Sequence, residues 1–383
     1  MGDSDFVRRL PGSQQAFGRR TPILSRWHID LPLLLLLMIL TTVGLLVLFS
    51  ASGQNWGAVK RQGVFFLVGY GAMFFLAQLS PVFYRRWSPA VYLAGVALLV
   101  AVLFVGVGAK GAQRWLDLPG LPRFQPSEIM KMVMPMTVAW YLSGRVLPPG
   151  FKYIFVALLI IGLPTFLVIK EPDLGTSILI ATSGMFVLFF AGVRWRYIFS
   201  AIALAVAAAW PAWNYVLHDY QKQRILTMLD PESDKLGAGW NIIQSKTAIG
   251  SGGLEGKGWM QGTQSQLDFL PESHTDFIIA VLAEELGLFG VLALLSLYLL
   301  IIGRGLMIAS RAQDTFGRLL AGSLTMTFFV YVAVNMGMVS GLLPVVGVPL
   351  PLVSQGGTAV VTLMAGFGCV MAISTEEQRI VTR

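Results

Sequence analysis

The residues best suited to chemistry lie where a polar, glycine-rich stretch meets an apolar one. The motif Leu270-Pro-Glu-Ser-His-Thr-Asp276 runs directly into the apolar residues 277–302, and it places Glu272, His274 and Asp276 at the junction. Ionisable side chains are costly to hold at the edge of an apolar layer, so those that occur there often have a function. We therefore expect chemistry at this junction.

Asp276 can serve in two ways. Ser273, followed three positions later by Asp276, matches a capping box, and the helix dipole favours a carboxylate in a first turn. Alternatively, an ionised carboxylate at the edge of a dry cavity can act as a general base that takes a proton from an attacking hydroxyl. The two roles are compatible, because a cap would also hold the side chain in place.

Two more carboxylates, Glu284 and Glu285, follow two to three turns along the same predicted helix. Their depth in the apolar segment draws attention to them. We interpret them as supports for that helix rather than as catalysts.

A second polar pair, Glu128 and Lys131, lies one helical turn apart within the apolar residues 127–142. Each would cost roughly 2.5 to 3.5 kcal/mol at mid-membrane, so pairing near a helix end is favourable. The pair fits either an ion pair whose lysine reaches towards the surface or a polar cavity between helices. Trp115, just upstream, lies in a short amphipathic loop, where tryptophan is more often an interface anchor than a ligand contact.

The composition places these residues in a membrane protein. The 383 residues are 55% hydrophobic and 13% charged, with a mean hydropathy of +0.69, which a water-soluble fold of this size does not tolerate. Runs of spanning length predict an all-α polytopic protein with ten transmembrane helices. They are Leu31 to Ser50, Val64 to Leu79, Ala90 to Val107, Ser127 to Leu142, Tyr153 to Ile169, Thr176 to Ala191, Tyr197 to Val216, Phe277 to Ile302, Leu319 to Val339 and Thr358 to Ile373.

Charge distribution predicts the orientation. Lys and Arg are concentrated in the short loops on the side of the N-terminus, which makes both termini cytoplasmic. The predicted domains are a cytoplasmic arm, 1–30, one membrane domain, 31–373, and a cytoplasmic tail, 374–383. Residues 218–275 form one large extracytoplasmic loop between helices 7 and 8, either a simple lid or a surface that gathers a polar head group.

The net charge of +8 fits orientation and contact with anionic lipid. No compact basic domain could carry nucleic acid, so we expect no nucleic-acid partner. Nearly all carboxylates outside the arm fall on the predicted outer face, where we expect the active site.

Several long motifs, in the same order, resemble the shape, elongation, division and sporulation (SEDS) family, and more closely its elongation branch. Gln355 departs from the family pattern, which commonly has a small residue or tyrosine there. The motifs are Leu270 to Phe277, Ala283-Glu-Glu-Leu-Gly287, Pro126-Ser-Glu-Ile-Met-Lys131, Glu171-Pro-Asp-Leu-Gly-Thr176, and Asn335 through Pro344 to Ser354-Gln-Gly-Gly-Thr358.

This resemblance implies a peptidoglycan glycosyltransferase of the bacterial cytoplasmic (inner) membrane, which polymerises lipid II on the outer face and releases undecaprenyl pyrophosphate. It implies Asp276 as the base, and Trp115, Glu128 and Lys131 as functionally sensitive positions. Glu272 and His274 belong to the same motif as Asp276.

The leaving group needs positive charge. We expect this charge from Lys131, Arg224 and Lys246, or from a bound divalent cation; no other cofactor is expected. The resemblance implies a class B penicillin-binding protein, a transpeptidase, and other membrane proteins of the elongation complex as partners.

Two other functions remain open from the sequence. One is a flippase for lipid-linked precursor, which would use the intramembrane charges, although no repeat symmetry supports it. The other is a noncatalytic scaffold of the elongation machinery.

Overall fold

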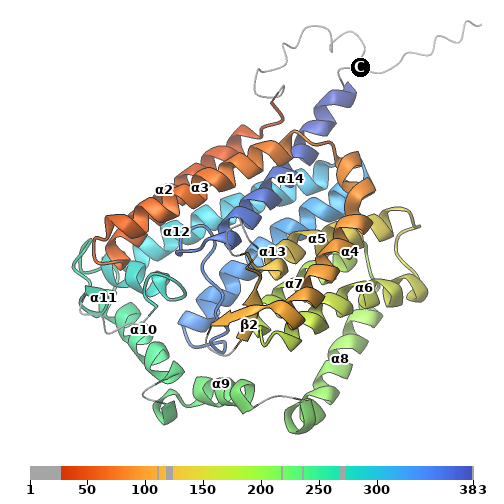
Figure 1. Cartoon of the computed structure of the whole chain (residues 1–383). Helices are drawn as coiled ribbons and strands as arrows, with labels where there is room; N and C mark the ends of the chain where they lie inside the picture. Colours follow the sequence, from red (N-terminus) through yellow and green to blue (C-terminus); the bar gives the residue numbers. More distant parts are fainter. Residues whose placement is uncertain are drawn as a thin grey trace, which may run out of the picture.

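The computed structural model describes residues 27–109, 112–117, 124–216, 219–234, 237–266 and 272–381. A long helix overlaps each predicted apolar segment, and most of these helices form one bundle (Figure 1). They are α2 (Leu31–Ala51), α3 (Trp56–Ala77), α4 (Pro81–Val105), α5 (Pro126–Ser143), α6 (Phe151–Lys170), α7 (Leu174–Phe190), α8 (Trp195–Pro211), α12 (Ile278–Arg311), α13 (Thr315–Val339) and α14 (Thr358–Val381).

Among the described residues, seven helices are long and apolar enough to cross a membrane. The other three are α7, which is shorter, and α3 and α5, which carry charged residues. Of the predicted arm, residues 1–26 lie outside the described residues, as do Leu270 and Pro271 of the junction motif. Helix α14 continues to Val381, into the residues 374–383 predicted as a cytoplasmic tail.

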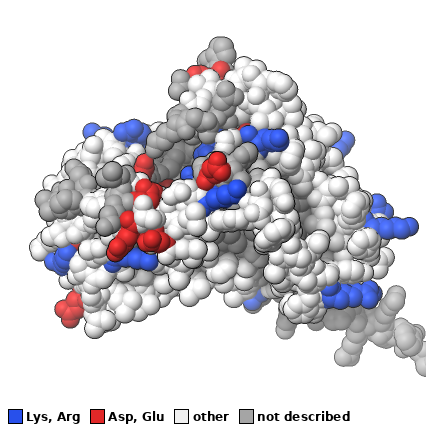
Figure 2. All heavy atoms as spheres, turned by 90° about the horizontal axis from the view of Figure 1, so that it is seen from below, with Lys and Arg blue, Asp and Glu red and all other residues white. Residues whose placement is uncertain are grey.

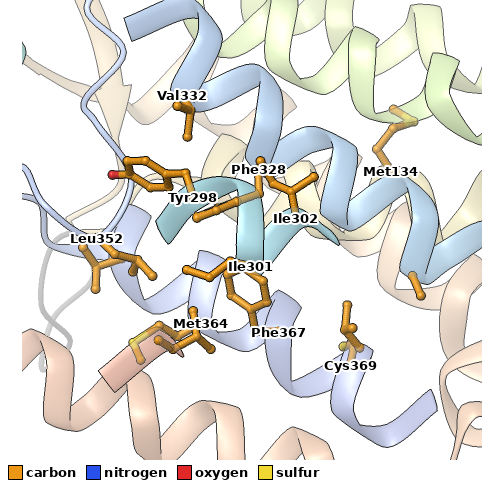
Figure 3. Packing of buried hydrophobic residues seen from close by; sticks show 14 of the residues in the cluster. Met134, Tyr298, Ile301, Ile302, Phe328, Val332, Leu352, Met364, Phe367 and Cys369 are labelled. Atoms are coloured by element: carbon orange, nitrogen blue, oxygen red, sulfur yellow. The ribbon is translucent and has the colours of Figure 1, made fainter. Parts of the chain in front are cut away.

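The core lies around α13, which packs against α12, α7, α5 and α14. Phe328 of α13 contacts Tyr298 of α12 and Phe367 of α14, with ring centroids 5.7 and 5.0 Å apart (Figure 3). The buried Tyr298 hydroxyl donates a hydrogen bond of 2.7 Å to the Pro351 carbonyl. This contact anchors the loop between α13 and α14, which forms one wall of the site described below.

The start of α2 and the end of α14 meet at one end of the bundle (Figure 1). There the Asp30 carboxylate accepts hydrogen bonds from Arg304 at 2.6 Å, from the Ser374 hydroxyl at 3.0 Å and from the Leu33 amide at 3.0 Å. One capping aspartate thus joins α2, α12 and α14, and places both ends of the membrane domain on the same side.

Where the structure describes it, the segment predicted as a large loop is mostly helical. After α8 and a π-helical turn, Ala212–Val216, the chain forms α9 (Asp219–Leu229), a 3-10 turn, Pro231–Asp234, and α10 (Ala238–Gly252), and then the short α11 (Thr263–Gln266). These elements arch below the bundle in Figure 1, and α10 returns to pack on α12.

One small hairpin departs from the predicted all-α fold. Strand β1 (Val107–Ala109) pairs antiparallel with β2 (Ala112–Trp115), and Leu116 and Phe124 exchange backbone hydrogen bonds of 3.0 and 3.3 Å. Hydropathy alone does not detect such short strands. The hairpin leads directly to Arg114 and Trp115 at the edge of the candidate site.

Candidate active site

A polar cavity of about 200 Å³ lies at the end of the bundle opposite the joined termini. The first turns of three helices, α5, α7 and α14, border it, and helix N-termini favour negatively charged groups. Its lining includes Arg114, Trp115, Gln125, Glu128, Lys131, Asp173, Thr176, Tyr331, Gly347, Val348 and Thr358. The structure therefore brings together three residues singled out from the sequence, Trp115, Glu128 and Lys131.

The predicted pairing of Glu128 and Lys131 is confirmed. Lys131 Nζ donates to Glu128 Oε1 at 2.6 Å, and the ammonium lies 5.0 Å from the centroid of the Tyr331 ring. Both residues are buried, so the alternative of a lysine that reaches to the surface is wrong. Glu128 Oε2 has no hydrogen-bond partner among the described residues, which leaves an acceptor at the cavity.

Asp173 is a site residue that the sequence reasoning quoted only within a motif. Its carboxylate caps α7 by accepting from the Thr176 amide at 3.2 Å, and it accepts from Gln125 Nε2 at 3.0 Å. Arg114 Nε lies 3.8 Å from Asp173 Oδ2, and the same guanidinium donates to the Pro172 carbonyl. Arg114 is thus a second cation at the cavity, fixed by the turn between α6 and α7.

Glu171 lies beside this cluster in the turn between α6 and α7. Its side chain is 1% exposed, and neither carboxyl oxygen has a hydrogen-bond partner among the described residues. Burial raises the pKa of Glu171, the negative charge of Asp173 adds to this shift and Arg114 opposes it, which together bring the pKa to about 8. Glu171 is therefore a neutral acid at pH 7.

Asp276 lies next to the cavity wall. The Asn335 side-chain amide donates 2.8 Å hydrogen bonds to the carbonyls of Asp276 and Val348. Gly347, which lines the cavity, lies so near that a Cβ built on it would be 3.6 Å from Asp276 Oδ2. The fully buried Asn335 thus ties the candidate base to the loop that forms the wall, a role that no local sequence pattern indicated.

The capping interpretation of Asp276 is wrong. Helix α12 begins at Ile278 with Phe277 as its N-cap, and no side chain caps it. The Ser273 hydroxyl donates instead to the Ala51 carbonyl at 3.3 Å, at the end of α2. Residues 272–277 form a turn that keeps Asp276 ahead of the helix.

Glu272 and His274 occupy this turn without lining the cavity. The Glu272 carboxylate accepts a 2.8 Å hydrogen bond from the Thr275 hydroxyl and is exposed. The His274 carbonyl accepts from the Gln355 amide at 2.9 Å, which joins the turn to the loop after α13. Gln355 thus takes part through its backbone, so its departure from the family pattern leaves this contact intact.

Arg224 and Lys246 lie on α9 and α10, and neither is among the residues that line the cavity. Figure 2 looks onto this end of the molecule, where acidic and basic side chains lie next to one another. Within the described ranges, no group of three or more His, Cys, Asp or Glu residues could hold a metal ion.

Comparison with known proteins gives concordant matches. The family profile for FtsW, RodA and SpoVE, described as "Cell cycle protein", matches residues 30–379. The peptidoglycan glycosyltransferase MrdB of Escherichia coli is 57% identical over 351 residues, which are 92% of this chain and 95% of that protein.

Two solved structures share the fold. A chain from a peptidoglycan synthase complex that coordinates polymerization and crosslinking is 30% identical, with a TM-score of 0.80 over 91% of this chain and 98% of that one. The rod shape determining protein RodA of Thermus thermophilus is 28% identical, with a TM-score of 0.68 over 91% of this chain and 97% of that one.

Proposed function

The chain belongs to the FtsW, RodA and SpoVE family, and we propose that it is a peptidoglycan glycosyltransferase that polymerises lipid II during cell elongation. The observation that carries this proposal is the polar cavity, which is lined by a buried ion pair and three helix N-termini and whose wall residue Gly347 lies next to the Asp276 carboxylate. Such a site suits a substrate whose reacting sugar carries a pyrophosphate.

In the proposed reaction, Asp276 removes the proton from the 4-hydroxyl of the acceptor lipid II. The oxygen then attacks the anomeric carbon of the growing chain, and the bond from that carbon to the pyrophosphate oxygen breaks. Undecaprenyl pyrophosphate leaves with the bonding electrons as a stable anion, so no acid has to protonate it. A single carboxylate base is sufficient for this step.

Positive groups at the cavity oppose the charge that develops on the leaving group. Lys131 and Arg114 line the cavity, and the first turns of α5, α7 and α14 add oriented backbone dipoles. Arg224 and Lys246, on α9 and α10, do not line the cavity, and we propose for them a supporting role in the approach of the substrate. Among the described residues no group of three or more His, Cys, Asp or Glu suits a divalent cation, so we assign the positive charge to the cavity side chains and helix N-termini.

The proposed membrane arrangement has ten spans, with α3, α5 and α7 crossing alongside the seven membrane-length helices. Both termini are cytoplasmic, which agrees with the surplus of Lys and Arg on their side. The cavity at the opposite end then opens on the outer face, on the same side of the bundle as α9 and α10.

The proposed partner is a class B penicillin-binding protein, which crosslinks the strands that this chain makes. Support comes from the similar chain that is part of a complex for polymerization and crosslinking. Other membrane proteins of the elongation machinery are proposed to join the same assembly.

The test is lipid II polymerisation by purified protein carrying Asp276→Asn. Loss of a general base lowers turnover by about 10² to 10⁴, so the variant should make little polymer while unfolding at the wild-type temperature. Asp219→Asn, at an exposed carboxylate on α9, is the matched control and should be fully active. Normal polymerisation by the Asp276 variant would remove the base assignment, and transport of lipid II without any polymer by wild-type protein would favour a flippase.

A further inference from the structure

Helix α12 is interrupted within its membrane-length span. Gly287 has φ 64° and ψ −163°, so the residues before it, 278–286, and those after it, 288–311, are separate helical pieces. The first piece follows directly on Asp276. The long second piece therefore does not fix the position of the candidate base through continuous helical hydrogen bonds.

Residues 253–258 fill this break, and we name them the inserted segment. In an unbroken helix, the Leu288 and Phe289 amides would donate to the Glu284 and Glu285 carbonyls. Here these two amides donate to the inserted segment, and these two carbonyls accept from it. The bonds are Leu288 N to Gly253 O at 3.0 Å, Phe289 N to Leu254 O at 3.2 Å, Lys257 N to Glu284 O at 3.0 Å, and Gly258 N to Glu285 O at 3.0 Å.

Glycine makes this close approach possible. A Cβ added at Gly252 or Gly256 would collide with backbone atoms of α12, and one added at Gly287 would collide with backbone atoms of the inserted segment. Gly256 and Gly287 also have positive φ values, of 83° and 64°. The contact is therefore one of backbone against backbone and leaves little space for slippage.

The Glu284 carboxylate stabilises the contact between α12 and the inserted segment. It is fully buried, and Oε1 accepts from Lys257 Nζ at 2.7 Å, from the Thr263 amide at 2.9 Å and from the Gln264 amide at 3.1 Å. A single side chain of the helical piece 278–286 thus holds residues 257, 263 and 264 in place through hydrogen bonds.

We propose that the inserted segment, held by the Lys257–Glu284 ion pair, is a positioning element that sets the place of Asp276 at the cavity. Residues 278–286 are held by Asn335 near their start and by the inserted segment at their end. Displacement of a reacting group by about 1 Å can lower a rate about 100-fold. This inference rests on the proposed function.

The test compares Lys257→Met with Lys60→Met, the same substitution at an exposed lysine of α3. Lys257→Met removes the ammonium group that pairs with Glu284 but keeps an aliphatic side chain of similar length. We expect kcat for lipid II polymerisation to fall at least about tenfold with KM within about twofold, because the substrate site is intact. Lys257→Arg should recover most of kcat, and Lys60→Met should leave both constants unchanged.

Hydrogen exchange provides a second readout on the same proteins. Peptides covering residues 253–258 and 283–289 should exchange faster in Lys257→Met, while the rest of the described chain keeps its protection. Gly252→Ala, which introduces the clash without a backbone change of its own, should show the same pattern, whereas Gly303→Ala has open space and should not.

The outcomes separate the two proposals. Unchanged kcat in a Lys257→Met protein with faster local exchange would overturn the positioning role while leaving the enzyme assignment intact. A fall in kcat that only follows a lower unfolding temperature would overturn it as well, since that is a stability effect. Absence of polymerisation by wild-type protein would instead overturn the proposed function.

Discussion

Replacing Glu171 with Gln should stabilise the protein at alkaline pH and leave it unchanged at acid pH. The wild-type carboxyl is buried, without a hydrogen-bond partner among the described residues, and close to the negative charge of Asp173. An amide of the same shape cannot ionise. Because no described hydrogen bond is lost, the substitution isolates the effect of the charge.

The magnitude follows from the pKa of Glu171, which burial raises from 4.5 to about 8. Since the folded-state pKa lies above the unfolded one, the stability associated with the neutral acid is fully present below pH 4.5 and is lost as pH rises through about 8. At about 1.4 kcal/mol for each pKa unit, the total loss is at most about 5 kcal/mol. The Glu171→Gln variant does not lose this stability, because its amide cannot ionise.

Thermal unfolding of purified protein from pH 5 to pH 9 measures the difference. We expect the unfolding temperatures to agree near pH 5 and to separate progressively, with the variant higher by several degrees at pH 8.5, taking about 2 °C for each kcal/mol. Glu232→Gln, at an exposed glutamate of the 3-10 turn, should show no such separation. A constant offset between wild type and Glu171→Gln at all pH values would refute a neutral Glu171 in the folded protein.

Three further predictions concern the residues at the cavity. Glu128→Gln should destabilise the protein by about 3 to 5 kcal/mol, because it leaves the buried Lys131 ammonium without its counter-charge, and thermal unfolding checks this. The double variant Glu128→Gln with Lys131→Met should recover stability in the same measurement but remain inactive in lipid II polymerisation. Asn335→Leu leaves two carbonyls without their donor and should lower kcat at least about tenfold, with KM nearly unchanged, in steady-state polymerisation; full activity in a folded variant would contradict the positioning of Asp276 by this amide.

Hydropathy located the helices because each apolar segment has to remain in an apolar layer, whatever its neighbours. Helical spacing also indicated the pairing of Glu128 and Lys131, since residues three apart on a helix lie on one face. Arg114, Asp173 and Asn335 were not identified as site residues, because their partners lie far away in the chain. Their contacts depend on which helix ends meet, and no local pattern determines that.

The capping box failed for a related reason. Its sequence signature requires the helix to begin at Ser273, but the Ser273 hydroxyl bonds to the Ala51 carbonyl and the chain makes another turn before α12 starts. A local motif of this kind competes with contacts from other elements, and a buried backbone carbonyl on α2 is a strong competitor.

The break in α12 has a signal in the sequence. The inserted segment, Gly253-Leu-Glu-Gly-Lys-Gly258, is too rich in glycine for a packed element of its own, and glycine density marks close approach between backbones. The partner of this segment must also lack a side chain at the contact, and Gly287 of α12 meets that condition. A glycine within a predicted helix thus gains meaning from a second glycine-rich segment that has to reach it. At this contact the backbone amides and carbonyls left unpaired by the break in α12 form their hydrogen bonds with the inserted segment.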